Sequence, residues 1–122
     1  MLLKEFYSVI NSEKTEKEFV TEIRINKDHA IYEGHFPGLP VTPGVILMQL
    51  FKEEAERQTN TKLQLDKASN VKFMAVVDPN TEANFFLYSE ILRDQDVVKL
   101  KGIAKHKGNI SLKISSEYKI VI

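Results

Sequence analysis

A dense run of glycine and proline, followed directly by an apolar stretch, constrains this chain more than any other feature of its sequence. Of the five glycines and four prolines, three of each lie between Gly34 and Gly44. That density excludes a helix or a regular strand and predicts an ordered, irregular loop, because proline fixes the backbone while glycine lets it bend. Thr42 and Pro43 then have the residue types of a helix N-cap and a first helical position.

We expect the helix to occupy about residues 43–58. Residues 45–51 are apolar on nearly every side, which predicts that the first two turns are buried all round. Residues 52–57 are charged, so Glu53 and Glu54 are predicted to belong to a solvated helix end. A half-apolar helix of this kind requires other elements around its first turns.

Two segments before the loop and four after the helix have strand character. Alternation of apolar and polar residues is clearest over 19–25. The segments are residues 6–10, 19–25, 71–76, 83–92, 97–104 and 110–122. Residues 11–17 are polar and predict a turn region. Short turns between the later strands predict one antiparallel sheet, which must curl around the helix to bury it. We therefore expect an α+β fold and a single domain over residues 1–122, and a symmetric dimer that covers the exposed sheet edge.

Composition excludes several classes of function. Seventeen basic and seventeen acidic residues leave no net charge to attract nucleic acid. The lysines over residues 99–107 are interpreted as a solvated strand, with docking of an acidic carrier protein as the alternative. There is no cysteine, which excludes disulfides, thiolate metal sites and a cysteine nucleophile. The three histidines are widely spaced, so no metal site is expected, and His29 and His106 are interpreted as surface residues.

No stretch approaches twenty apolar residues, and the first ten lack a signal-peptide pattern. We therefore expect no membrane insertion and a cytoplasmic location.

The segment over residues 32–45 reads Tyr-Glu-Gly-His-Phe-Pro-Gly-Leu-Pro-Val-Thr-Pro-Gly-Val. It resembles, without gaps, the signature of the hotdog-fold β-hydroxyacyl-acyl-carrier-protein dehydratases, in which Gly-His-Phe-Pro-Gly precedes Pro-Val-x-Pro-Gly-Val. Residues 71–73 and 77–80 are similar to the family's strand and turn after the helix. The resemblance covers roughly residues 31–80. It implies a hotdog fold, in which an antiparallel sheet wraps one long central helix.

The resemblance also implies an activity: dehydration of a (3R)-3-hydroxyacyl thioester to the trans-2-enoyl thioester, in fatty-acid or related acyl biosynthesis. No cofactor is implied, since the acyl group travels on the phosphopantetheine of an acyl carrier protein or of coenzyme A. The implied partners are the acyl thioester, the carrier protein and further hotdog subunits. These would form a homodimer, a larger oligomer of dimers, or a heterodimer with another hotdog chain.

The residue types fit this chemistry. A histidine that titrates near neutral pH suits removal of the proton next to the thioester carbonyl. Backbone N–H groups at a helix start stabilise negative charge on the carbonyl oxygen. By resemblance, His35 is the base and the Gly44 N–H polarises the carbonyl; capping of the loop backbone is the alternative for His35.

The expected substrate-binding residues are Phe36, Pro37, Gly38, Val45 and Met48. Of these, Val45 and Met48 form an apolar stripe with Phe51, interpreted first as core and second as acyl-tunnel wall.

One position departs from the family pattern. Dehydratases of this family have Glu or Asp five residues after the helix glycine, and here that residue is Gln49. An amide forms hydrogen bonds but cannot give up a proton at neutral pH. His35 would then act alone, with Gln49 orienting the hydroxyl or a water. Alternatively Glu53, one turn further on the same face, supplies the acid. A third alternative is that Gln49 only bonds the loop inside the core.

The sequence also agrees with two other functions to different degrees. A non-catalytic acyl-thioester-binding subunit, paired with a hotdog chain that supplies the acid, agrees with Gln49. A hotdog thioesterase needs a carboxylate to activate water or attack the carbonyl, and Gln49 disfavours it.

Overall fold

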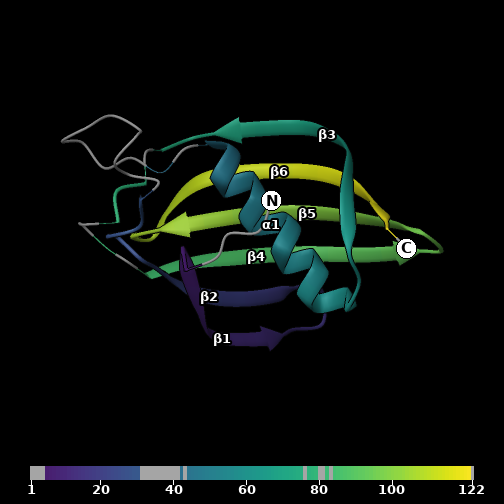
Figure 1. Ribbon diagram of the computed structural model, residues 1–122, viewed down its shortest axis with the longest axis horizontal. Coiled ribbons are helices and arrows are strands. Elements are labelled where there is room, and N and C mark those ends of the chain that lie inside the picture. The colour runs from purple at the N-terminus through teal and green to yellow at the C-terminus, as the bar shows by residue number, and fades with distance from the viewer. Residues whose placement is uncertain are drawn as a thin grey trace.

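The chain folds in the predicted order of two strands, one helix and four strands (Figure 1). The structure is a computed structural model, and it describes residues 5–30, 42, 44–75, 77–79, 82 and 84–121. The elements are β1 (Tyr7–Lys14), β2 (Phe19–Ile25), α1 (Gly44–Thr59), β3 (Leu63–Phe73), β4 (Asn84–Asp94), β5 (Val97–His106) and β6 (Asn109–Ile120). The helix thus agrees with the prediction to within about one residue at each end.

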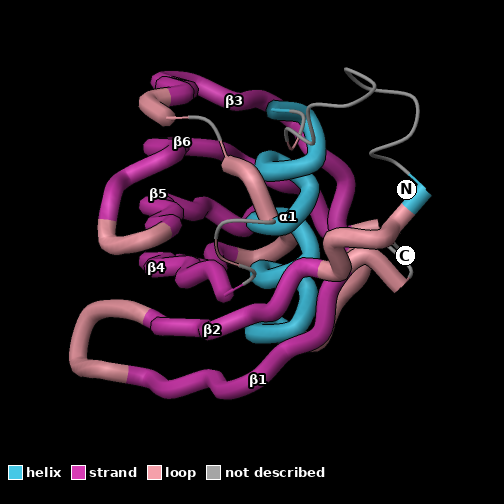
Figure 2. The backbone as a smooth tube through the Cα atoms, turned by 90° about the vertical axis from the view of Figure 1, so that its left-hand side faces the viewer, coloured by secondary structure: helices cyan, strands magenta, loops and turns pink. Residues whose placement is uncertain are grey.

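The strands form one six-stranded sheet in the order β1-β2-β4-β5-β6-β3. Each neighbouring pair is antiparallel. The sheet curls around α1, as the side view of the backbone shows (Figure 2). The predicted α+β architecture, an antiparallel sheet wrapped around one helix, is therefore confirmed.

The core lies between α1 and the concave face of the sheet. Leu47, Leu50 and Phe51 are buried on the helix side. They face buried apolar side chains of the central strands, namely Ile23, Phe85, Leu87, Leu100 and Leu112. The packing is closest at Gly102 on β5, where an ideal Cβ would stand 2.5 Å from a carbon of the Phe51 ring. Glycine at this position therefore lets the helix approach the sheet.

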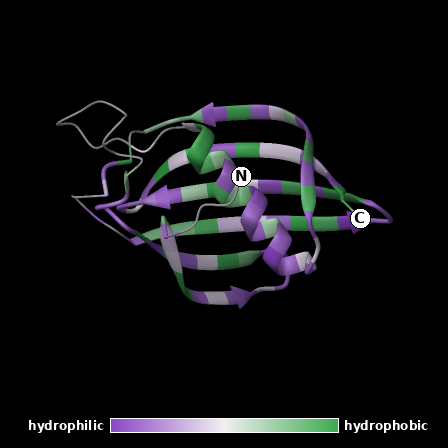
Figure 3. Ribbon diagram, viewed as in Figure 1, coloured by the Kyte–Doolittle hydropathy of each residue, from purple (hydrophilic) through white to green (hydrophobic). Residues whose placement is uncertain are grey.

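The predicted burial of the first helical turns on all sides is wrong. Val45 is 68 % exposed, and Met48 and Gln49 are only partly buried. Figure 3 shows hydrophobic residues concentrated in the first turns of α1 and hydrophilic ones in its later turns. The exposed apolar face exists because the curled sheet covers the helix from one side and leaves this face open beside β3.

Both edge strands differ from the sequence prediction. Strand β3 begins at Leu63, eight residues before the predicted strand over 71–76, and β1 continues to Lys14 through the predicted turn region. Nearly all of their residues are exposed, so neither has the apolar alternation by which strands are recognised. Two register shifts against β6 accompany a marked bend of β3 (Figure 1).

The segment that leads into α1 is tied to the segment after β3. The N–H of Thr42 donates a hydrogen bond to the carbonyl of Val77 at 2.9 Å, and Thr42 is buried. Pro43 lies outside the described residues, and the N-cap role of Thr42 stays a prediction. The start of the helix is nevertheless anchored to a second part of the chain.

Candidate active site

The first residue of α1 lies under an aromatic ring. An ideal Cβ at Gly44 would stand 2.8 Å from two carbons of the Phe73 ring, which comes from the end of β3. No side chain fits there unless the ring moves. Gly44 therefore allows β3 to approach the helix N-terminus, where free backbone N–H groups create a partial positive charge.

An apolar pocket of about 210 Å³ lies beside the next turns of the helix. It is formed by α1 together with β3 and β6. Its lining residues are Val45, Met48, Gln49, Lys52, Leu65, Ile114 and Tyr118. Two of the expected substrate-binding residues and Gln49 therefore line one pocket. Lys52 was missed at the sequence level, although its spacing from Val45 and Met48 puts it on the same helix face.

Gln49 is held by the residue one turn further along the helix. Its Nε2 donates a hydrogen bond to Glu53 Oε2 at 3.1 Å. The other oxygen of Glu53 accepts a hydrogen bond of 2.8 Å from the hydroxyl of Tyr7 on β1. Glu53 is partly buried, so the prediction of a solvated helix end is wrong for this residue. These two hydrogen bonds connect Gln49, which lines the pocket, with the edge strand β1.

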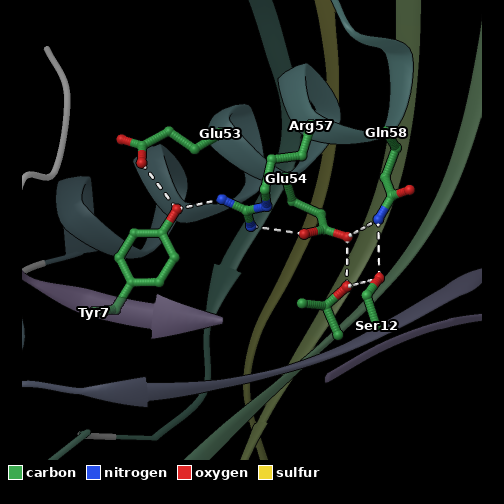
Figure 4. Close-up of polar contacts among 7 residues, drawn as sticks. Tyr7, Ser12, Glu53, Glu54, Arg57 and Gln58 are labelled. Carbon is green, nitrogen blue, oxygen red and sulfur yellow. Dashed lines mark hydrogen bonds and ion pairs between the residues drawn. The ribbon is translucent and has the colours of Figure 1, made fainter. Parts of the chain in front are cut away.

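Tyr7 lies between Glu53 and Arg57 (Figure 4). Arg57 Nη1 donates a short hydrogen bond to the Tyr7 hydroxyl. Burial of the phenol raises the pKa of Tyr7 to about 12, even though Arg57 acts to lower it. The pKa of Arg57 is raised because its contacts with Tyr7 and Glu54 outweigh its burial. Tyr7 therefore keeps its proton over the physiological pH range.

Glu54 is completely buried, and the prediction that it is solvated is wrong. Its carboxylate accepts hydrogen bonds from Thr21 at 2.6 Å, Arg57 at 2.7 Å and Gln58 at 2.9 Å. A buried charge needs such partners. Glu54 therefore anchors the second half of α1 to β2, while Glu53 points toward Tyr7 (Figure 4).

The remaining histidine predictions have mixed outcomes. His106 is buried rather than on the surface, and its Nε2 lies 2.7 Å from the carbonyl oxygen of Glu82. His29 is partly buried and packs edge-on against Phe6, with ring centroids 5.5 Å apart. The contacts of both histidines join residues that are far apart in the sequence, so a local sequence pattern does not reveal them.

His35, Phe36, Pro37 and Gly38 lie outside the described residues, so their roles stay predictions. Among the residues that are described, no cluster of three or more candidate metal ligands occurs. In the same part of the chain, no helix is long and apolar enough to cross a membrane.

Comparison with known families decides the relationship. The model of the ApeI-like dehydratases, described as ApeI dehydratase, matches residues 11–115. The chain belongs to the ApeI-like dehydratase family. The match spans most of the strands and all of α1. The sequence-level resemblance to hotdog dehydratases is therefore confirmed for this ApeI-like chain.

A curated relative supports the same relationship over a shorter stretch. The 3-hydroxyacyl-[acyl-carrier-protein] dehydratase FabZ of Roseobacter denitrificans is 33 % identical over 58 residues. That alignment covers 47 % of the ApeI-like chain and only 37 % of the length of the relative.

Solved structures share the fold. The dehydratase heterocomplex ApeI:P from Xenorhabdus doucetiae contains a chain that matches with a TM-score of 0.66 and 15 % identity, covering 94 % of the ApeI-like chain and 97 % of that chain. Cj0977, a sigma28-regulated virulence protein of Campylobacter jejuni, matches with a TM-score of 0.69 and 9 % identity, over 99 % and 88 % of the two chains. At such low identities the likeness shows a common hotdog fold.

Proposed function

We propose that this chain eliminates water from a (3R)-3-hydroxyacyl thioester and forms the trans-2-enoyl thioester. The observation that carries the proposal is the arrangement at the start of α1. Gly44 is the first residue of the helix, and Gln49, five residues later, lines an apolar pocket. A pocket with apolar walls and a few polar groups is the usual form of a small-molecule site. Membership of the ApeI-like dehydratase family supports the same reaction.

In the proposed mechanism, His35 removes the proton next to the thioester carbonyl. The Gly44 N–H stabilises the negative charge that develops on the carbonyl oxygen. The carbon–carbon double bond then forms as the bond between the β carbon and its hydroxyl breaks. His35 returns the abstracted proton to the departing hydroxyl, which leaves as water, so His35 acts first as base and then as acid. Because His35 both removes and returns the proton, the reaction needs no second acid.

The proposed substrate arrives on the phosphopantetheine arm of an acyl carrier protein or of coenzyme A, and the protein needs no cofactor of its own. Val45 and Met48 would contact the acyl chain, with Phe36, Pro37 and Gly38 completing the site. A larger hollow of about 810 Å³ lies beside β1 and β2, and its walls are mainly polar and charged. The smaller pocket is favoured for an acyl chain because most of its walls are apolar.

The proposed partner surface is the free edge of β3 and the adjoining face of α1. Leu65, Phe73, Met74 and Val45 are exposed there. Within the described residues, β3 pairs only with β6 and so has one unpaired edge. Exposed apolar groups next to an unpaired strand edge favour pairing with a second subunit. That subunit is a second copy of this chain, or another hotdog chain in a heterodimer.

A second candidate function is an acyl-thioester-binding subunit without its own turnover. Gln49 favours it, because an amide lacks the transferable proton that the family's acidic residue supplies. The relative from Xenorhabdus doucetiae is part of a dehydratase heterocomplex. By analogy, a partner hotdog chain would supply the missing acid.

The deciding experiment measures enoyl-thioester absorbance with 3-hydroxyacyl carrier protein as substrate. Purified wild type, His35→Ala and Gln49→Glu are compared at equal concentration. Turnover by wild type and its loss in His35→Ala would support the dehydratase. A silent wild type with an active Gln49→Glu variant would support the binding subunit. If all three proteins are silent in the presence of a hotdog partner as well, both candidates are wrong.

A further inference from the structure

A hollow of about 410 Å³, called here the outer hollow, lies on the face of the sheet that is turned away from α1. Lys101 and Ile103 of β5 line it, and along the strand they alternate with buried residues. Successive side chains of a strand point to opposite faces, so these two point away from the helix. Because α1 lies against the inner face (Figure 2), the sheet separates the outer hollow from the apolar pocket beside the helix.

Three lysines from three different strands line the outer hollow. They are Lys72 of β3, Lys101 of β5 and Lys113 of β6. Lys72 and Lys113 are register partners, so they lie directly opposite each other on adjacent strands. Like charges in that arrangement repel and weaken an antiparallel pair. The pairing of β3 with β6 therefore contains a local cost that an uncharged residue at either position would avoid.

A β-bulge in β3 creates this opposition. Just before Lys72, β3 has one residue more than the facing segment of β6. Within the bulge, Asn70 has a φ of 53°, a left-handed conformation that few residues other than glycine adopt. Without the extra residue, Val71 would lie opposite Lys113, because a slip of one residue exchanges the two faces of a strand. The bulge also turns Phe73 toward the helix start, but this does not require a lysine at position 72.

Lysines nearer the other end of the same face have carboxylate partners. The ammonium groups of Lys67 and Lys99 lie 3.7 and 3.9 Å from the two carboxylate oxygens of Glu117. Lys119 lies 3.8 Å from a carboxylate oxygen of Asp66. Among the described residues, by contrast, no ion pair involves any of the three lysines of the outer hollow.

The outer hollow has an acidic side and a cationic side. Its two carboxylates belong to Glu18, just before β2, and to Glu90 on β4. Glu90 is the register partner of Lys101, which therefore has a negative charge opposite it. Lys72 and Lys113, on the side of β3 and β6, face each other instead. Two adjacent ammonium groups match a ligand group that carries two negative charges.

We propose that the outer hollow binds a phosphate monoester, with the phosphoryl group between Lys72 and Lys113. A phosphate monoester carries about 1.5 to 2 negative charges at pH 7. Ammonium groups donate charge-assisted hydrogen bonds to phosphate oxygens. Asn70 and Ser115 line the same hollow and have uncharged donors. The bound phosphoryl group would neutralise the opposed lysines, so the repulsion between them becomes a source of affinity.

The outer hollow also has room for the organic part of such an ester. Its volume lies within the range of about 300–1,000 Å³ that is usual for small-molecule sites. Tyr88 and Ile103 line it beside the lysines and offer an aromatic ring and an aliphatic side chain. The same phosphoryl chemistry occurs in soluble metabolites and in the headgroup of phosphatidic acid. Neither the lysines nor this hollow takes part in the proposed dehydratase chemistry.

The first test is an NMR titration of the full chain with adenosine monophosphate and with glycerol phosphate. We expect the dissociation constant to rise by about tenfold or more in Lys72→Met and in Lys113→Met, because each loses a charge-assisted hydrogen bond. Lys99→Met is the matched control on the same face, where Lys99 pairs with Glu117, and should stay within about twofold. Equal weakening in all three variants overturns the proposal, as does binding of adenosine as tight as that of its monophosphate.

Cosedimentation with vesicles of equal parts phosphatidic acid and phosphatidylcholine tests the lipid source. Vesicle binding that requires Lys72 and Lys113, without binding of either soluble ester, assigns the site to a lipid headgroup. Binding of the soluble esters alone assigns it to a metabolite. The proposal is wrong if none of them binds, or if only an acidic protein such as apo acyl carrier protein shifts the signals of these lysines.

Thermal unfolding tests the opposed lysine pair itself. Without ligand, we expect Lys72→Met and Lys113→Met each to raise Tm, and the double variant to gain little more, because the first substitution already removes the repulsion. The gain should shrink at high salt, and Lys99→Met should show none. Adenosine monophosphate should raise the Tm of the wild type but not of the double variant. Lysine variants without this gain, together with an unchanged response to the ester, refute the site.

Discussion

The ring of Phe73 lies so close to Gly44 that two of its carbons would be 2.8 Å from a Cβ at that position. Real Cβ atoms do not approach ring carbons that closely, so Gly44→Ala must displace the ring. Phe73 is 53 % exposed and has room to move. The contact between β3 and the helix start is therefore tight but adjustable.

We expect Gly44→Ala to lower the free energy of unfolding by about 1 kcal/mol, because overpacking forces a neighbour out of its place. The change should be smaller in a Phe73→Ala background, where the clash is gone. Urea unfolding of the wild type, both single variants and the double variant measures this coupling. Strictly additive effects would show that the ring and the glycine do not constrain each other.

Glu54 provides a test of stability away from the pocket. Glu54→Ala leaves Arg57, Thr21 and Gln58 without their shared acceptor, and we expect a loss of about 3 kcal/mol in the free energy of unfolding. Glu54→Gln should lose less, since it keeps the shape and one acceptor oxygen. Glu90→Ala on β4 is the exposed control and should stay within about 0.5 kcal/mol of wild type. Chemical denaturation gives all three values, and equal effects at both sites would contradict the assignment of Glu54 as an anchor.

The raised pKa of Tyr7 predicts that the free energy of unfolding falls at alkaline pH. Its pKa is raised from 10.0 to about 12 by burial, so the folded chain holds this proton to higher pH than the unfolded chain. Stability from this group is complete below pH 10 and is lost as the pH rises toward 12.

The difference between the tyrosinate absorbance titrations of wild type and Tyr7→Phe isolates this phenol from the other tyrosines. That separation is needed because burial also raises the pKa of Tyr118. We expect the difference curve to have its midpoint near 12. A midpoint at 10 would show that Tyr7 is solvated and would remove its buried contact with Glu53.

The two edges of the sheet should differ in their role in assembly. Phe73→Asp on β3 introduces a charge next to exposed Leu65 and Met74, and we expect it to shift the protein toward monomers in sedimentation velocity. Ile10→Asp on β1 is the matched control, because Ile10 is exposed to a similar degree on the opposite edge. If Ile10→Asp dissociates the protein and Phe73→Asp does not, the partner surface lies on β1.

Local patterns were sufficient for much of the fold. The apolar helix next to a glycine- and proline-rich loop, and the strands joined by short turns, predicted a sheet around one helix with the correct order of elements. The motif at the helix start led to the family. The family resemblance also led to the expectation that Gly44, Val45, Met48 and Gln49 belong to one site, and the last three of these line one pocket.

The spacing of Glu54 along the helix is typical of a buried residue, although the charged residues around it led to the prediction that it is solvated. Glu54 follows Leu47, Leu50 and Phe51 at core spacing, so helical periodicity put it on the buried face. Its negative charge, taken alone, suggested that the side chain is exposed to solvent. Whether a carboxylate can occupy such a position depends on Thr21 and Gln58, and the first of these lies on a strand far away in the chain.

By itself, the sequence determined the helix, its glycine start and the kind of fold, because these follow from residue types at short spacing. Tertiary structure alone decided the contact of Glu53 with Tyr7, the burial of Glu54 and the position of β3 at the sheet edge. The first two depend on Tyr7, Arg57 and Thr21, whose contacts close long loops of chain. The third depends on β3 pairing with β6 rather than with β4. Long-range pairing has no local periodicity, so only the folded chain reveals it.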